Sequence, residues 1–280
     1  MWMSKLLATS DLHVGYAGNR PFVSSIAPQS DGDWLIVAGD VADHFDEIVS
    51  TLSTLRERFE TVIWTPGNHE LWSLPGEAGD LRGVARYDAV VTALRAAGIV
   101  TPEDPYPVWQ GPNGPLFIVP LFLLYDYTFR PASSRSAADA LTMAEEAGVV
   151  CSDEFLLHPD PYPSRAAWCA ARVKATSARL DALPPGSRTV LVNHFPLVRE
   201  PTMRLRYPEF ALWCGTEETA DWPVRYRAEA VVYGHLHIPI TDRIDGIPHH
   251  EVSLGYPEEW DRLGARERRV VRIIGSGPDT

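Results

Sequence analysis

The stretch Trp-Leu-Ile-Val-Ala-Gly-Asp-Val-Ala-Asp, residues 34–43, combines a short apolar run with a polar end. The run at 34–38 has the length and the β-branched content of a buried strand. It ends at Gly39, which lets the backbone approach closely, and at Asp40, whose two carboxylate oxygens can bridge two ions. The stretch therefore predicts a strand that carries a metal ligand at its carboxyl end.

Four further pieces of the chain repeat this arrangement of an apolar run followed by polar donors. They are Asp11-Leu12-His13, Gly67-Asn68-His69-Glu70, Asn193-His194 and Gly234-His235-Leu236-His237. Carboxylate, amide and imidazole donors without thiolate suit Mn²⁺, Fe or Zn²⁺. Two such ions close together form a clamp for in-line attack on phosphorus. Because α/β proteins place their sites at the carboxyl ends of strands, we expect a dinuclear metal site there.

The spacing within the pieces predicts which donors act together. In an extended segment, Asp11 and His13 would point to the same face and hold one ion. On a strand, His237 would likewise face the same way as His235. The neutral amide oxygen of Asn68 would leave the second ion a stronger Lewis acid. The imidazoles expected to complete this second site are those of His194 and His235.

His69 follows a predicted ligand but is not needed to fill a coordination sphere. It is therefore free to protonate a leaving oxygen or to stabilise charge on a phosphoryl group. Asp43 could orient and charge this imidazole, and Glu70 is a second candidate for the same role. We expect the nucleophile to be a water or hydroxide that bridges the two metal ions.

Hydrophobic periodicity predicts strands that alternate with helices early in the chain and become hairpin-like later. The predicted strands are residues 5–9, 34–38, 61–65, 116–122, 188–192, 230–233, 238–244, 249–254 and 269–274. The predicted helices are residues 43–59, 84–97 and 165–183, and Asp245-Gly246 is a hairpin signal. This pattern indicates a mixed sheet, or two sheets, covered by helices.

Two long stretches, 125–163 and 196–223, fit no regular element and are rich in proline, aromatic and charged residues. Long loops of this kind are usually functional, and their aromatic content argues against disorder. We expect them to form caps over the metal site. The sequence thus predicts a single domain over residues 1–275 with two cap loops, followed by a flexible tail at 276–280.

The composition restricts the class of partner and the compartment. A formal net charge of −12 over 280 residues argues against a nucleic-acid binder, which normally has a basic stripe. Three cysteines without a CxxC motif fit a reducing compartment. The N-terminus reaches a polar motif too early for a signal peptide, and no apolar run approaches the roughly 20 residues needed to span a membrane. We therefore expect a cytoplasmic protein without membrane contact.

The five pieces, in this order, match the pattern DxH, GDxxD, GNH[DE], H and GHxH. In this pattern the chain resembles the calcineurin-like metallophosphoesterases. The resemblance implies an α/β fold, a four-layer αββα sandwich of two mixed sheets flanked by helices. It implies one ion held by Asp11, His13, Asp40 and His237, and another held by Asp40, Asn68, His194 and His235. It also gives His69 the acid or charge-stabilising role, with Asp43 orienting it.

Seven shorter stretches carry a narrower resemblance. They are residues 33–40, 68–72, 122–127, 153–157, 207–210, 212–216 and 255–260. They look like the phosphopantetheinyl hydrolases of actinobacteria, which cut a phosphodiester with Mn²⁺ or Fe to remove the 4′-phosphopantetheine arm from carrier proteins. The resemblance implies a carrier-protein substrate. The alternative is a phosphomonoesterase or nucleotide hydrolase that acts on a small phosphorylated metabolite, because fold and metals do not set the substrate. A metal-stabilised scaffold without catalysis is disfavoured by the presence of His69 and Asp43.

A long, flexible arm needs a groove that is lined by aromatic side chains and a few hydrogen-bond donors. The predicted substrate-binding residues on the two cap loops are Tyr125, Arg130, Arg199, Arg204 and Trp213. Further candidates on the same loops are Tyr127, Phe129 and Tyr207. An acidic carrier protein would also need a local positive patch, because the chain is itself acidic. The arginines predicted to form that patch are Arg199, Arg204, Arg206, Arg225 and Arg227.

Overall fold

Two β-sheets lie face to face in the computed structural model, which describes residues 4–76, 81–262 and 270–274. The first sheet has the order β10-β1-β2-β3, with β1 Leu6–Thr9, β2 Trp34–Val37, β3 Thr61–Trp64 and β10 Val271–Arg272. The second has the order β4-β5-β6-β7-β9-β8, with β4 Val108–Gly111, β5 Gly114–Pro120, β6 Thr189–Val192, β7 Ala228–Tyr233, β8 Ile240–Ile244 and β9 Ile247–Glu251. Each sheet combines parallel and antiparallel pairs, so both are mixed.

The alternation of side chains along each strand separates three apolar layers. In the first sheet, Leu35 packs toward the helices whereas Ile36 packs into the space between the sheets. In the second sheet, Val190 and Val192 face that same inner space, whereas Leu191 faces outward. Because both faces of the central strands are buried, β1, β2, β3 and β6 are almost wholly apolar, whereas the edge strand β8 alternates with exposed polar residues.

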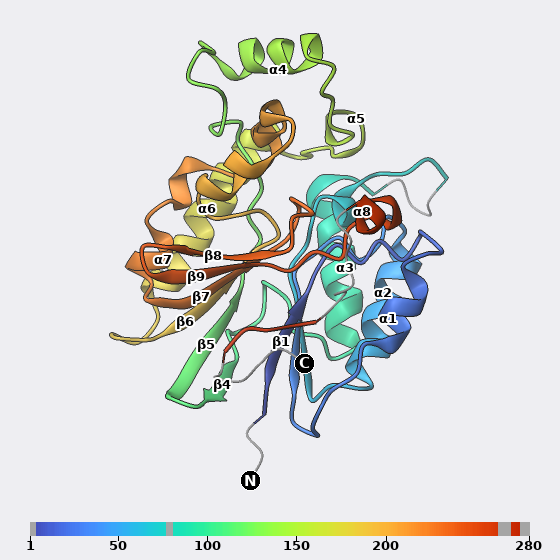
Figure 1. Cartoon of the computed structure of the whole chain (residues 1–280), viewed down its shortest axis with the longest axis vertical. Coiled ribbons are helices and arrows are strands. Elements are labelled where there is room, and N and C mark those ends of the chain that lie inside the picture. The colour runs from blue at the N-terminus through green and yellow to red at the C-terminus, as the bar shows by residue number, and fades with distance from the viewer. Residues whose placement is uncertain (1–3, 77–80, 263–269, 275–280) are drawn as a thin grey trace.

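Helices cover the outer face of each sheet, which completes a four-layer αββα sandwich (Figure 1). The first sheet is covered by α2 Phe45–Arg56 and α3 Gly83–Ala96, with the short α1 Arg20–Ser25 beside them. The second is covered by α6 Arg165–Asp181 and α7 Trp222–Arg225. The predicted apolar face of α2 is buried at Ile48, Leu52 and Leu55, and Phe59 beyond its end is buried with them. The predicted fold class is confirmed.

Each predicted strand has a counterpart, although residue 269 of the last one lies outside the described residues. The hairpin at Asp245-Gly246 is also present: both residues have positive φ, 51° and 78°, as a type I′ turn requires between β8 and β9. Strand β4 was not predicted. It has four residues, ends at Gly111 and follows two prolines at 105 and 107, so its sequence resembles a loop.

The two cap stretches contain helices, so the expectation that no regular element fits them was wrong. They hold α4 Ala137–Glu146, α5 Asp153–Leu156 and the 3₁₀ helices η2 Glu200–Arg204, η3 Pro208–Trp213 and η4 Glu217–Thr219. The Ser136 side chain accepts a hydrogen bond from the Asp139 N–H, which caps α4, while prolines begin η2 and η3. Figure 1 shows α4 and α5 standing beyond the sheets.

Two further expectations concern the ends of the chain and membranes. The predicted tail at 276–280 lies outside the described residues. Among the described residues, every helix is too short or too polar to cross a bilayer.

Candidate metal centre and active site

The predicted metal ligands converge at one edge of the two sheets. Each follows the carboxyl end of a strand: β1 leads to Asp11, β2 to Asp40, β3 to Asn68, β6 to His194 and β7 to His235. The strands β1, β2 and β3 run parallel, as do β5, β6 and β7. Parallel strands end on the same side of a sheet, so side chains distant in sequence meet there.

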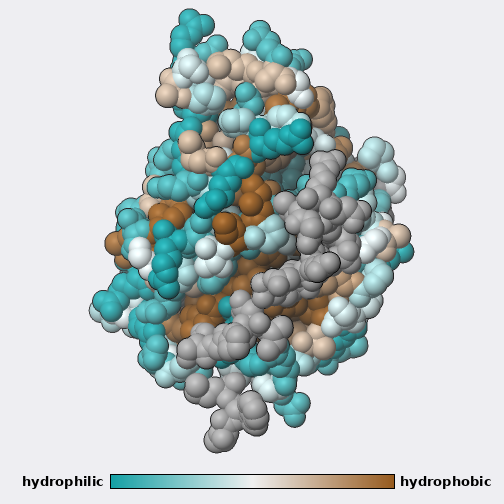
Figure 2. All heavy atoms as spheres, in the orientation of Figure 1, coloured by the Kyte–Doolittle hydropathy of each residue, from teal (hydrophilic) through white to brown (hydrophobic). Residues whose placement is uncertain are grey.

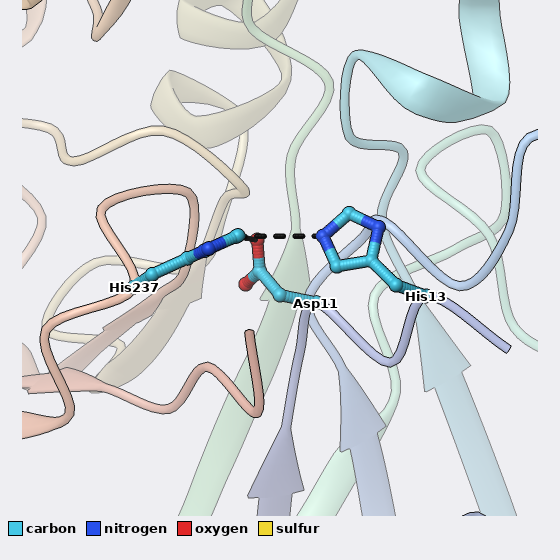
Figure 3. A group of neighbouring side chains, drawn as sticks. All are labelled: Asp11, His13 and His237. Atoms are coloured by element: carbon cyan, nitrogen blue, oxygen red, sulfur yellow. Dashed lines mark hydrogen bonds and ion pairs between the residues drawn. The ribbon is translucent and has the colours of Figure 1, made fainter. Parts of the chain in front are cut away.

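One group of donors consists of Asp11, His13 and His237, whose ligand atoms lie within 4.8 Å of one another. Figure 3 shows the Asp11 carboxylate lying between the two imidazoles. The two Nε2 atoms of His13 and His237 are 3.4 Å apart, and Oδ1 of Asp11 lies 3.1 Å from Nε2 of His237. Two imidazoles and a carboxylate converging in this way fit one divalent cation.

A second group consists of Asp40, His194 and His235, also with ligand atoms within 4.8 Å. Nε2 of His194 lies 3.3 Å from Oδ2 of Asp40 and 3.1 Å from the amide Oδ1 of Asn68. Nε2 of His235 is buried without a hydrogen-bond partner in the described part of the chain. A buried ring nitrogen without a hydrogen-bond partner destabilises the folded state, and a metal ion bound to this group would give the nitrogen a partner.

The backbone at these ligands differs from the prediction. Asp11 and His13 have positive φ, 53° and 41°, and so do His235 and His237, at 69° and 52°. The residues therefore follow the strands in left-handed turns, and the expectation that each pair lies in an extended segment was wrong. The turns nevertheless bring Asp11, His13 and His237 together, because the backbone N–H of His235 donates a hydrogen bond of 3.1 Å to the side-chain carboxylate of Asp11 and so joins the two loops.

Asp40 is held in place by a buried carboxylate that sequence reasoning had assigned otherwise. Glu70 accepts hydrogen bonds from the N–H groups of Asp40, Val41 and Gly67, at 3.0, 2.7 and 2.7 Å. Burial and the charge of Asp40 raise the pKa of Glu70 to about 7. A Cβ at Gly67 would collide with Oδ1 of Asp40, so this position needs glycine. Glu70 therefore joins the loop that follows β2 to the loop that follows β3. It does not orient the imidazole of His69, which is the role considered for it above.

His69 begins the short 3₁₀ helix η1 His69–Leu71 and is paired with Asp43, the other candidate. Nδ1 of His69 lies 2.6 Å from Oδ1 of Asp43, and Nε2 lies 3.8 Å from Oδ2 of Asp40. Burial alone would lower the pKa of His69, but the charges of Asp40 and Asp43 raise it above its ordinary value. The imidazole therefore favours the protonated form that a general acid needs.

Burial and charge divide the remaining imidazoles and carboxylates into two classes. Burial lowers the pKa of His13 to about 3, with help from the neighbouring His69, and lowers that of His235 to about 3, with help from His194. Burial opposes ionisation of Asp11, yet the hydrogen bond and charge of His237 hold its pKa well below its usual range. Burial also opposes protonation of His194 and His237, yet the charges and hydrogen bonds of Asp40 and Asp11 raise the pKa of His194 to about 9 and that of His237 well above its ordinary value. Metals bind neutral imidazoles, so His13 and His235 already have the binding form, whereas His194 and His237 would release a proton to a bound ion.

A cavity of about 560 Å³ opens onto both donor groups. Its floor includes Asp40, Asn68, His69, His235 and His237. The rest of its wall comes from the two cap stretches and from segments that follow the strands. The cap residues are Val149, Val150, Cys151, Ser152, Leu205, Arg206, Tyr207 and Phe210, and the others are Trp72, Leu236, Ile238, Tyr256 and Glu259. Figure 2 shows apolar side chains exposed in the centre of the face drawn, bordered by hydrophilic ones. A polar floor under a largely apolar wall suits a phosphate ester with an organic substituent.

None of the five predicted substrate-binding residues lines this cavity. Tyr125 and Trp213 are buried, and they donate hydrogen bonds to Asp153 and Glu154 at 3.0 and 2.8 Å. Aromatic residues in a cap pack into its interior by preference, which the composition of a loop does not reveal.

The predicted arginines lie mostly in ion pairs away from the floor. Arg204 binds Asp242 through two bonds of 3.0 and 2.7 Å. Arg199 donates to the backbone oxygen of Arg130 at 2.8 Å, and Arg225 donates to a carboxylate on α6. Of the five patch arginines, Arg206 is the one on the cavity wall, where it stacks on the ring of Tyr207 at 5.3 Å.

Three residues near the site were not predicted to act there. Oε2 of Glu259, in α8 Pro257–Arg262, lies 2.7 Å from Nδ1 of His237. The ring of Tyr256 stacks on His13 at 4.5 Å, and its hydroxyl lies 3.4 Å from Nε2 of His69. Asp153 contacts the amide of Asn68. All three lie in stretches quoted for the narrower resemblance, but no spacing rule connects them to the ligands.

Comparison with known proteins agrees with this geometry. The chain is 56% identical over 257 residues to the [acyl-carrier-protein] phosphodiesterase PptH of Mycobacterium tuberculosis, covering 92% of this chain and 79% of that protein. The crystal structure of phosphopantetheinyl hydrolase (PptH) from the same organism superposes with a TM-score of 0.94 at 53% identity, covering 99% of this chain and 97% of that one.

The family model for calcineurin-like phosphoesterases matches residues 4–239, the span that contains every predicted ligand. This family uses divalent metals in a dinuclear site, in keeping with the two donor groups. The chain belongs to the calcineurin-like phosphoesterase family.

Proposed function

We propose that this chain is a metal-dependent phosphodiesterase that releases 4′-phosphopantetheine from holo carrier proteins. The observation that carries the proposal is the pair of buried donor groups on one cavity, in a chain 56% identical to an acyl-carrier-protein phosphodiesterase. We further propose Mn²⁺ and Fe as the ions, with Zn²⁺ as a possible substitute, because all donors are nitrogen or oxygen. Three buried, free cysteines support a cytoplasmic setting.

In this proposal, Asp11, His13, Asp40 and His237 hold one ion, and Asp40, Asn68, His194 and His235 hold the other. Bound divalent ions would polarise the phosphoryl group and lower the pKa of an attacking water. Oδ2 of Asp40 lies 3.3 Å from Nε2 of His194, which supports its place at the second ion. The family pattern motivates the proposal that the same carboxylate also binds the first ion.

His69 supplies the proton that the reaction needs. Water adds to phosphorus and releases one proton to solvent, and the bond from phosphorus to the serine oxygen of the carrier protein breaks. That oxygen takes a proton from His69, which regains a proton from solvent. The products are 4′-phosphopantetheine and an apo carrier protein with a free serine hydroxyl. Asp43 holds the imidazole through Nδ1 at 2.6 Å, which leaves Nε2 to face the cavity.

We also propose the domain boundaries: one domain over residues 1–275, with 125–163 and 196–223 as its cap. Both stretches contribute to the cavity wall, through Val149 and Val150 on one side and Leu205 and Tyr207 on the other. A cap that closes the cavity in this way would exclude water from the organic part of the substrate.

The test is intact mass spectrometry of a holo acyl carrier protein after incubation with the enzyme and Mn²⁺, with His69→Ala as the control. Loss of the whole phosphopantetheine arm, absent with the variant, is the expected result. Metal content of the variant should be unchanged, because His69 is assigned to neither ion. An unchanged carrier mass together with turnover of an aryl phosphate would contradict the carrier substrate and favour a small phosphorylated metabolite.

A further inference from the structure

A buried carboxylate from the cap reaches the second donor group. Asp153 is the first residue of α5 and is completely buried. Its Oδ1 accepts hydrogen bonds from Nδ2 of Asn68 at 3.0 Å and from Nε1 of Trp72 at 2.7 Å. Its Oδ2 accepts one from the hydroxyl of Tyr125 at 3.0 Å. With three donors facing it, the carboxylate has one fixed orientation.

This contact decides which end of the Asn68 amide faces the metal centre. An asparagine amide has an oxygen that can bind a cation and an NH₂ group that cannot. Because Nδ2 donates to Asp153, Oδ1 is directed to the other side, where it lies 3.1 Å from Nε2 of His194. A rotation of the amide by half a turn would break the bond to Asp153 and present NH₂ to the second ion.

We propose that Asp153 is a positioning residue that holds Asn68 in its metal-binding orientation and so couples the cap to the second metal site. The inference rests on the proposed function for the assignment of Asn68 as a ligand. It extends that function by making a residue 85 positions away in the sequence part of the support of the metal site.

The surroundings of α5 explain how a helix of four residues can hold such a position. Arg165 donates to the backbone oxygen of Asp153 at 2.6 Å and to the carboxylate of Glu154 at 3.0 Å. Glu154 also accepts from the hydroxyl of Tyr127 and from Nε1 of Trp213, both at 2.8 Å. The two neighbouring carboxylates thus have different tasks: Asp153 binds the ligand loop, and Glu154 binds the rest of the cap.

The test is a titration of the metal-free full-length protein with Mn²⁺ alone, followed by calorimetry, on four proteins. The wild type should bind two equivalents. Asp153→Ala should bind one of them about 10- to 100-fold more weakly, the usual cost of removing the partner that orients a ligand. Asp153→Asn keeps an acceptor oxygen for Nδ2 of Asn68 and should restore most of that affinity. Glu154→Gln, the matched control, should bind both equivalents as the wild type does.

The proposal would be overturned if Asp153→Ala bound both equivalents of Mn²⁺ with wild-type affinity. It would also be overturned if Asp153→Ala and Asp153→Asn lost equal affinity, because the charge of Asp153 and not its orientation of Asn68 would then matter. If Asp153→Ala does not fold, Tyr125→Phe decides. It removes one donor to Asp153 and should weaken one equivalent selectively, whereas unchanged binding would count against the proposal. The titration contains no substrate, so its result can be interpreted even if the protein does not act on carrier proteins. Binding of fewer than two equivalents by the wild type would overturn the inference and the dinuclear site together.

Discussion

The metal-donor groups at the strand ends and the cap above them differ in how deeply their side chains are buried. At the strand ends, each ligand lies within a few residues of a parallel strand, and Asp11 and His194 are completely buried. In the cap, large apolar side chains remain exposed, among them Val150 at 59% and Met203 at 78%. The sheet edge is therefore a buried chemical centre, whereas the cap presents an exposed apolar surface to whatever enters the cavity.

Asp40→Ala would test this comparison with the largest expected effect. The Asp40 carboxylate is part of the second donor group and lies beside His69. We therefore expect its loss to impair both metal binding and acid catalysis. We expect activity on any phosphate ester to fall on the order of a thousandfold. Steady-state kinetics with an aryl phosphodiester provide the measurement.

Asp181→Ala is a suitable control for this change, because its carboxylate is half exposed and pairs with Arg225 on the surface. It should leave turnover unchanged. Retention of most activity in Asp40→Ala would show that the chemistry does not depend on the strand ends.

We expect a buried histidine of the second sheet to make the free energy of unfolding fall at acidic pH. Burial, with the charge of His250, lowers the pKa of His249 in β9 to about 4 from 6.5. As the pH falls below 6.5, the unfolded chain takes up a proton that the folded chain refuses, so the folded state loses stability. Between pH 7 and pH 5, this group should cost about 2 kcal/mol of unfolding free energy.

Urea unfolding of the wild type and of His249→Leu at both pH values measures this contribution. The variant should lose less stability on acidification than the wild type does. An identical pH dependence in His249→Leu would mean that the His249 imidazole takes up its proton as readily in the folded state as in the unfolded state.

The smallest expected effect concerns the cap surface. Val150 lines the cavity and is 59% exposed, so Val150→Glu should hinder a large, acidic substrate at the entrance. We expect KM for a holo carrier protein to rise roughly tenfold, with little change for a small aryl diester.

Val224→Glu gives a close match for this experiment, since Val224 is 57% exposed on α7 and does not line the cavity. It should leave both KM values unchanged. Equal increases for both substrates, or for both variants, would show that the cap surface does not contact the carrier.

Most of the strand-end region could be predicted from sequence, because each ligand stands directly after its strand. Parallel pairing then brings Asp11, Asp40 and His194 to one edge, whatever the intervening loops do. The conformation of the ligand turns could not be predicted. A spacing of two residues suits an extended segment, whereas the left-handed conformation of these residues accompanies hydrogen bonds between distant loops, such as that from the His235 N–H to the Asp11 carboxylate.

The cap was less predictable, because its order depends on contacts between residues far apart in sequence. The helix α5 has four residues, too few for a periodic pattern, and its position depends on Arg165 and Trp213. The same contacts explain why Tyr125 and Trp213, which we expected to bind substrate, are buried inside the cap. The cavity wall is formed by Tyr207, which was a further candidate, and by residues of the same stretches that were not predicted, such as Val149 and Leu205.

The left-handed turns at the metal centre have a consequence for engineering. Asp11, His13, Asp40, His235 and His237 all have positive φ, a conformation that costs a residue with a side chain about 1 kcal/mol or more relative to glycine. Glycine at these five positions would relieve this backbone strain. A search for heat-stable variants that ignores activity should therefore select against the metal ligands first, and thermostability screens of this enzyme need a catalytic readout.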